Sequence, residues 1–157
     1  LLLLLDRLLE NGQDFRLSLV GEQFRQQPPV FATIGQRHRS RLCHYGYVER
    51  VTDYHRLLRE ADVVISTALH DFQGLAMLEA MAAGCLALAP NRLAYPEYVP
   101  AGNLYNSLPE DAGAEAQSAA AVLQRLLDGQ PAPAVPDAFR LSRLQAQYRQ
   151  GIESLLR

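Results

Sequence analysis

The chain has 157 residues, a formal net charge of −2 at pH 7, and a composition that is 48% hydrophobic and 20% charged. These values are typical of one globular domain with a hydrophobic core. A net charge so close to zero argues against a surface dedicated to nucleic acid or to anionic lipid. No stretch approaches the ~20 consecutive apolar residues of a transmembrane helix, so we expect no contact with a membrane. Because the chain shows no secretory signal, we expect a cytoplasmic protein.

Cysteine, histidine and lysine usage narrows the class of protein further. Cys43 and Cys85 lie far apart inside apolar segments, which predicts small buried thiols rather than a disulfide framework. The 4 histidines lack the spacing of metal ligands, so we expect neither a metal nor another cofactor. All 15 basic residues are arginines, which we interpret as the mark of a genome with arginine-biased codons.

Glycine, proline and asparagine separate a series of apolar segments with helical or strand periodicity. Asn11-Gly12 ends the first helix, Pro28-Pro29 opens the second, and Asp53 is a candidate N-cap for the third. In chain order we expect a helix over residues 1–10, a strand over 15–20, a helix over 30–35, a strand over 42–45, a helix over 53–61, a strand over 62–67, a helix over 73–83, a strand over 85–89, a short helix or turn over 95–97, an edge strand over 103–105, a helix over 112–127, and a last helix capped by Asp137 or Ser142.

Apolar strands that alternate with helices predict an α/β fold, a Rossmann-like parallel sheet with helices on both faces. We divide the chain into a Rossmann-like domain over residues 1–128, a Pro-rich connector over 129–136 and a C-terminal helix over 137–157. The pattern begins with a helix, so we expect the opening strand of this fold to be missing from the chain. That strand would occupy the middle of the sheet, supplied by upstream residues or by a neighbouring chain.

Sheets of this type bind ligands beyond the carboxyl ends of their strands. The most informative loop there contains Asp71 and Gly74, and Glu79 lies about two turns into the helix that follows. The free N–H groups at the start of that helix favour a diphosphate, and Gly74 lets a ligand approach the backbone. A carboxylate on each side of this anion site favours a ligand with hydroxyls at both ends. A nucleotide-sugar has that layout.

The segment from Asp71 to Glu79 resembles the Glu-x7-Glu motif of family-4 retaining glycosyltransferases, with Asp in place of the first Glu. The segments LVGEQF, HYGYV, ADVVIST, HDFQGLAMLEAMAAGC and YPEYVP look closer still to one subgroup, the tRNA-queuosine alpha-mannosyltransferases and their bacterial relatives. The matching stretch covers roughly residues 1–105. The resemblance implies the C-terminal, donor-binding half of a bacterial GT-B glycosyltransferase that transfers mannose from GDP-mannose, with queuosine-modified tRNA as acceptor. It also implies that a missing N-terminal domain carries the acceptor site, and that the fragment alone is inactive.

The resemblance also implies a role for each matching position. Asp71 would be the catalytic residue that binds hydroxyls of the transferred hexose, and Glu79 would hold the ribose hydroxyls. The remaining donor-binding positions would be Leu75 and Ala76 on the diphosphate, Phe72 and Gly74 beside the hexose with His70 next to them, Gly46, Tyr47 and Val48 around the base, and Gly21 and Glu22 on the phosphate side.

Two departures from the family pattern keep an alternative open, a catalytically inactive nucleotide-binding or assembly module. Asp71 is one methylene shorter than Glu, and the usual phosphate-neutralising Lys has no counterpart, although Arg25 is near. A third interpretation is one half of a nucleotide-sugar epimerase. Two groups of side chains also have both a functional and a purely structural interpretation: an RNA-contacting or simply solvated cluster of Arg37, His38, Arg39 and Arg41, and the base-stacking or core-rim tyrosines Tyr45, Tyr47 and Tyr54.

Overall fold

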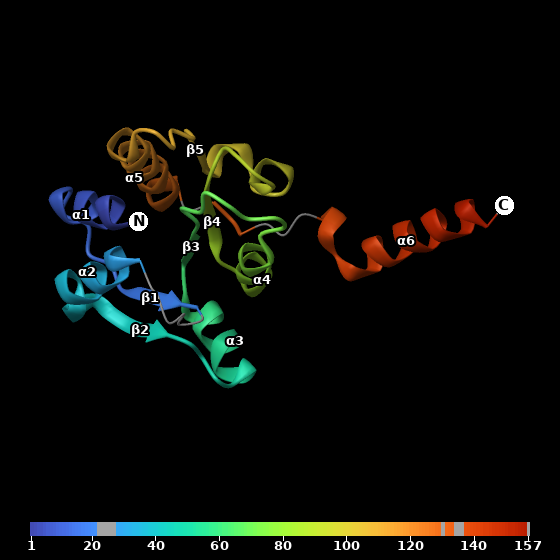
Figure 1. Ribbon diagram of the computed structural model, residues 1–157, viewed down its shortest axis with the longest axis horizontal. Helices are drawn as coiled ribbons and strands as arrows, with labels where there is room; N and C mark the ends of the chain where they lie inside the picture. Colours follow the sequence, from blue (N-terminus) through green and yellow to red (C-terminus); the bar gives the residue numbers. More distant parts are fainter. Residues whose placement is uncertain (22–27, 130, 134–136, 157) are drawn as a thin grey trace.

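The computed structural model describes residues 1–21, 28–129, 131–133 and 137–156. Figure 1 shows helices and strands in the predicted alternation. The elements are α1 (Leu2–Glu10), β1 (Leu17–Val20), α2 (Pro29–Arg37), β2 (Leu42–Gly46), α3 (Val51–Glu60), β3 (Val63–Ile65), α4 (Leu75–Ala83), β4 (Leu86–Pro90), β5 (Leu104–Tyr105), α5 (Ala112–Gly129) and α6 (Leu141–Leu155), with short 3-10 helices at Arg39–Arg41, Tyr95–Glu97, Ala101–Asn103 and Asp137–Phe139.

The strands form two parallel sheets, one with the order β1-β2 and one with the order β3-β4-β5. In the first sheet Val20 pairs with Gly46, and in the second Ile65 pairs with Leu88. Within the described residues no pairing joins β1 to β3, so these residues do not build one complete sheet. The predicted parallel α/β fold is confirmed.

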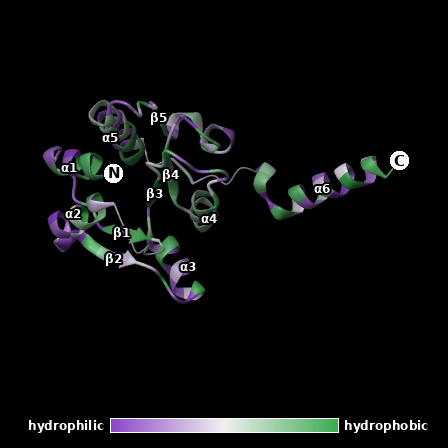
Figure 2. Ribbon diagram, in the orientation of Figure 1, coloured by the Kyte–Doolittle hydropathy of each residue, from purple (hydrophilic) through white to green (hydrophobic). Residues whose placement is uncertain are grey.

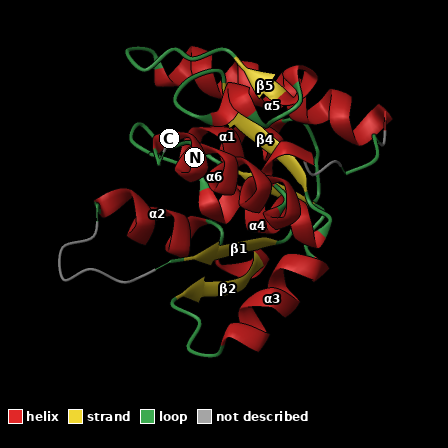
Figure 3. Ribbon diagram, turned by 90° about the vertical axis from the view of Figure 1, so that its right-hand side faces the viewer, coloured by secondary structure: helices red, strands yellow, loops and turns green. Residues whose placement is uncertain are grey.

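Strand β4 is buried on both faces and therefore divides the core into two clusters. Leu88 points into a cluster that α1 and α5 cover, together with Ile34 of α2. Ala87 and Ala89 point the other way, into a cluster that α4 covers. This alternation follows from the two-residue period of a strand. Figure 3 shows the resulting helices on both sides of the strands.

Both sheets share the first cluster, although no hydrogen bonds join them within the described residues. Leu17 and Leu19 of β1 and Val63 and Ile65 of β3 pack against it as half-buried side chains. Helix α1 supplies three of its buried members, Leu4, Leu5 and Leu8. The apolar burial is therefore continuous across the sheet interruption.

Three local predictions are wrong. Asp53 is not an N-cap: the backbone of Arg50 accepts the first bonds of α3, from the amides of residues 53 and 54, so Asp53 lies inside the first turn. Neither Asp137 nor Ser142 caps α6, because Arg140 holds that position and Asp137 belongs to the preceding 3-10 helix. Cys43 is exposed, since β2 alternates between half-buried and exposed positions, whereas Cys85 is buried as predicted.

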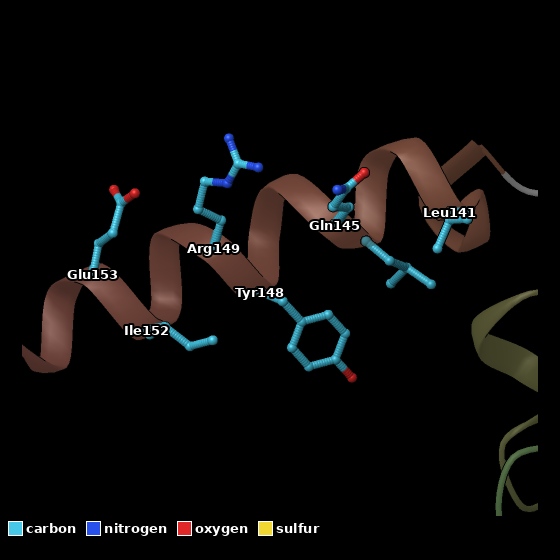
Figure 4. Close-up of a pocket in the computed structure, with 7 residues that line it drawn as sticks. Leu141, Gln145, Tyr148, Arg149, Ile152 and Glu153 are labelled. Carbon is cyan, nitrogen blue, oxygen red and sulfur yellow. The ribbon is translucent and has the colours of Figure 1, made fainter.

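Helix α6 extends away from the two sheets (Figure 1). Its apolar residues lie on one side, as Tyr148 and Ile152 show in Figure 4, while Arg149 and Glu153 project from the other side. Figure 2 shows the same alternation of hydrophobic and hydrophilic positions along the helix. Both apolar side chains are largely exposed, at 70% for Tyr148 and 59% for Ile152. None of the described helices combines the length and the apolar character that crossing a membrane requires.

Candidate functional site

The carboxyl ends of β1 and β2 bring two of the predicted loops together. The amide of Gly21 donates a 3.1 Å hydrogen bond to the carbonyl of Gly46. Gly46 is buried and has a φ of 115°, a conformation that side chains disfavour. Beyond it, Tyr47 is 63% exposed and Val48 is half-buried. Glu22, which the resemblance places on the phosphate side, lies outside the described residues, and so does Arg25, the arginine near the position of the missing Lys.

Gly74 is the N-cap residue of helix α4; it is buried and has a φ of 65°. A Cβ atom at this position would lie 1.9 Å from the Tyr98 hydroxyl oxygen. We expected glycine here because a ligand approaches the backbone; the structure adds a second reason, because a tyrosine from the loop after β4 approaches it too. Only glycine combines this conformation with this contact.

Both oxygens of the Asp71 carboxylate accept hydrogen bonds from the protein. The amide of Gly74 donates to Oδ1 at 2.8 Å, and the hydroxyl of Tyr95 donates to Oδ2 at 2.7 Å. The Ser66 hydroxyl lies 2.7 Å from the Tyr95 oxygen, and the amide of Ala68 donates to Ser66 at 3.2 Å. Because Tyr95 donates its proton to Asp71, Ser66 must be the donor toward Tyr95.

Tyr95 is fully buried. Burial, reinforced by the Asp71 carboxylate, raises the pKa of Tyr95 to about 12 despite the opposing hydrogen bond from Ser66. Tyr95 therefore stays protonated at neutral pH and remains a donor. Each Asp71 oxygen keeps a lone pair for a further hydroxyl, since a carboxylate oxygen accepts two hydrogen bonds.

The first turn of α4 leaves backbone amides without acceptors. The first bond of the helix runs from the amide of Leu78 to the carbonyl of Gly74 at 3.0 Å. In the part of the chain that the structure describes, no acceptor pairs with the amides of Leu75 and Ala76. Both residues are exposed, and so are the neighbouring His70 and Phe72. A helix end with free amides attracts an anion such as a diphosphate.

Glu79 is exposed and lies about one turn into α4 rather than the predicted two, because the helix begins at Leu75 and not at residue 73. The hydroxyl of Tyr54, in the first turn of α3, donates to its Oε2 at 2.8 Å. Burial, followed by the bond to Glu79, raises the pKa of Tyr54 to about 12. The sequence suggested only base stacking or core packing for Tyr54, because nothing in a sequence marks a contact between residues on two different helices.

An ion pair that the sequence analysis did not predict joins the loop after β4 to helix α5, and its arginine also contacts the loop after β3. Arg92 donates to both oxygens of Glu115, at 2.7 and 3.1 Å, and to the carbonyl of Ala68 at 3.0 Å. Glu115 also accepts a 2.7 Å bond from the amide of Leu108. Burial acts to raise the pKa of Glu115, but the bonds from Arg92 and Leu108 outweigh it and the pKa is lowered. The position of Arg92 just after β4 is the one sequence signal that could have suggested this role.

In the basic cluster at residues 37–41, two of the three arginines form ion pairs with acidic side chains. Arg37 pairs with Asp6 of α1, Arg41 pairs with Asp14, and His38 is buried. Among the described residues, no group of three acidic, histidine or cysteine side chains is placed to hold a metal ion. The structure thus places Asp71, Gly74, Leu75 and Ala76 at the start of α4 and Glu79 in the middle of that helix. The bond from Tyr54 ties Glu79 to α3, the helix that follows the Gly46 loop.

Comparison with known proteins places the chain in a family. Residues 1–138 match the model of glycosyl transferases group 1. Over 101 residues the chain is 44% identical to a tRNA-queuosine alpha-mannosyltransferase of Drosophila melanogaster, a match that covers 64% of this chain and 26% of that protein. The chain therefore spans about a quarter of the length of this relative.

Two solved structures share the fold. The pneumococcal O-GlcNAc transferase GtfA, solved with UDP and GlcNAc, matches 98% of this chain and 32% of its own, with a TM-score of 0.75 at 14% identity. AviGT4, a glycosyltransferase involved in avilamycin A biosynthesis, matches 78% of this chain and 36% of its own, with a TM-score of 0.51 at 25% identity. The family match over most of the chain and the GT-B fold of these neighbours together show that this chain belongs to the glycosyl transferases group 1 family.

Proposed function

We propose that this chain is the donor-binding half of a retaining glycosyltransferase, with GDP-mannose as donor. One observation carries the proposal: Asp71 and Glu79 flank the start of α4, where the amides of Leu75 and Ala76 have no acceptor in the described part of the chain. An anion site between two carboxylates matches a ligand with a diphosphate between two hydroxyl-bearing sugars.

Each part of the donor then has a place. The diphosphate lies on the amides of Leu75 and Ala76, the hexose beside Asp71, and the ribose beside Glu79. We assign the remaining roles from the family resemblance: His70, Phe72 and Gly74 beside the hexose, Gly46, Tyr47 and Val48 around the base, and Gly21 on the phosphate side, while Glu22, to which the resemblance gives the same side, lies outside the described residues. We propose that binding needs no metal, since the helix amides stabilise the diphosphate charge.

The acceptor is part of the same proposal. The similarity to a tRNA-queuosine alpha-mannosyltransferase supports queuosine-modified tRNA. Because this chain spans only 26% of that relative, we place the acceptor site on a further domain outside the chain, and expect the chain alone to bind donor without transferring sugar.

One observation favours a second candidate, a module that binds nucleotide without catalysis. The guanidinium of Arg92, in the loop after β4, is paired with Glu115 rather than free to neutralise a leaving diphosphate. Loss of such neutralisation removes several kcal/mol of transition-state stabilisation.

Two measurements separate the candidates. Calorimetric titration of the full-length protein with GDP, GDP-mannose and UDP-sugars should show binding of GDP and GDP-mannose, and Glu79→Ala should weaken it. Incubation with GDP-mannose and queuosine-containing tRNA should add the mass of one hexose to the tRNA. Nucleotide binding without any transfer to tRNA would favour the non-catalytic module, and absence of nucleotide binding would overturn both.

A further inference from the structure

Tyr54 and Glu79 form a hydrogen-bonded pair across the junction of α3 and α4. The Tyr54 hydroxyl lies 2.8 Å from Glu79 Oε2, and the two residues are 25 positions apart in the chain. Glu79 is exposed and Tyr54 is half-buried, so a ligand can reach both side chains. Along the chain, Asp71 precedes the free amides at the start of α4, and Glu79 lies about one turn beyond them.

The bond leaves two acceptors next to each other. A tyrosine hydroxyl has one proton, and Tyr54 donates it to Oε2, so its oxygen keeps lone pairs. No donor from the described part of the chain reaches Glu79 Oε1. Two neighbouring acceptors fit the two hydroxyls of a vicinal diol, and the ribose of a nucleotide carries such a diol.

Tyr54 is itself held in place. The carbonyl of Arg50 accepts a bond from the Tyr54 amide at 3.1 Å, and Asp53 pairs with Arg50 at 2.8 Å in the same turn. At the other end of α3, the Cys85 thiol donates to the carbonyls of Leu58 and Ala61 at 3.1 and 3.3 Å. These contacts fix the helix that carries Tyr54 against the segment between α4 and β4.

We propose that Tyr54 is the residue that positions the Glu79 carboxylate and, together with it, makes the donor site prefer ribose over deoxyribose. This assignment rests on the proposed function, because it takes the ligand to be a nucleotide. Without the Tyr54 hydroxyl, Glu79 is a solvated side chain on an exposed helix face and loses rotamer freedom only when the ligand binds.

The test compares GDP with 2′,3′-dideoxy-GDP on the full-length protein by calorimetric titration. The wild type should bind GDP more tightly. Tyr54→Phe should weaken GDP binding about 10-fold, as expected for one lost hydrogen bond to a charged group, and should leave dideoxy-GDP binding unchanged. Glu79→Ala should have a similar effect, and the double variant should lose little more than Glu79→Ala alone, because the two residues act as one unit.

Tyr148→Phe, which removes a hydroxyl from α6, is the matched control and should change neither affinity. Thermal unfolding of Tyr54→Phe should match the wild type, so that a loss of affinity cannot come from unfolding. If Tyr54→Phe keeps the full preference for GDP over dideoxy-GDP, or loses affinity for both equally, the assignment is wrong while the proposed function stands. If the wild type binds neither GDP nor UDP, the proposed function itself fails, and the assignment with it.

Discussion

The hydroxyl of Tyr95 donates a 2.7 Å hydrogen bond to Oδ2 of Asp71 and so joins the loop after β3 to the 3-10 helix after β4. Tyr95 is fully buried, whereas Asp71 is half-buried. The orientation of the carboxylate that we place beside the hexose therefore depends on a side chain that no ligand can touch.

Removing this hydroxyl should affect both stability and transfer. Tyr95→Phe leaves the half-buried Ser66 hydroxyl without its acceptor and one Asp71 oxygen without its protein donor. The loss should cost about 1–3 kcal/mol of unfolding free energy and lower kcat more than the affinity for GDP. Urea unfolding and transfer kinetics measure the two effects. Tyr98→Phe is the control, because its hydroxyl makes only a long 3.4 Å bond to the carbonyl of Gly74. Equal losses in the two variants would contradict the role of Tyr95.

Gly74→Ala should destabilise the protein through both strain and collision. The added Cβ would lie 1.9 Å from the Tyr98 hydroxyl, and the backbone has a φ of 65°. We expect a loss well above the ~1 kcal/mol that a positive φ alone imposes. Gly12→Ala is the matched control, with a φ of 73° and open space around it. Chemical unfolding should show a larger loss at Gly74, and Tyr98→Phe should restore part of it; comparable losses at the two glycines would contradict this.

Arg92→Ala should cost about 3 kcal/mol, since it leaves the largely buried Glu115 carboxylate unpaired. Both side chains of this ion pair are only 13% exposed. The exposed pair of Arg140 and Asp137 provides the control, and Arg140→Ala should change stability by about 0.5 kcal/mol or less. Urea unfolding at neutral pH separates the two cases.

The same ion pair predicts a pH dependence. The pKa of Glu115 is lower in the folded protein than its ordinary value, so the folded state binds its proton less tightly than the unfolded state. Its contribution to stability is then present above the ordinary pKa and disappears as the pH falls through the lower folded value. Unfolding experiments over the acid range should show this loss in the wild type and a smaller one in Arg92→Ala. Parallel curves for the two proteins would contradict the assignment.

The apolar side of α6 should contribute little to the stability of this chain. Ile152 is 59% exposed, so Ile152→Ala should change the unfolding free energy by about 0.5 kcal/mol or less. Leu123→Ala, on the buried face of α5, should cost about 2–5 kcal/mol by comparison. A large loss for Ile152→Ala would show that α6 packs against the domain.

The sequence alone was sufficient for features that depend on near neighbours along the chain. Apolar runs predicted β1 to β5, and the eight-residue spacing of Asp71 and Glu79 placed both carboxylates around the start of one helix. Sequence-based prediction failed at Cys43, where exposure depends on the position of the strand in the fold. It also failed at Asp53 and Asp137, because α3 begins before and α6 begins after the residue with the best capping side chain.

The tertiary structure alone determined which partners hold the site residues. Tyr95 reaches Asp71 across 24 positions, Tyr54 reaches Glu79 across 25, and Arg92 reaches Glu115 across 23. Each of these pairs joins segments that become neighbours only when parallel strands and their crossover helices pack together. Helical and strand periodicity describes one element at a time, so it carries no information about which side chains of two different elements meet.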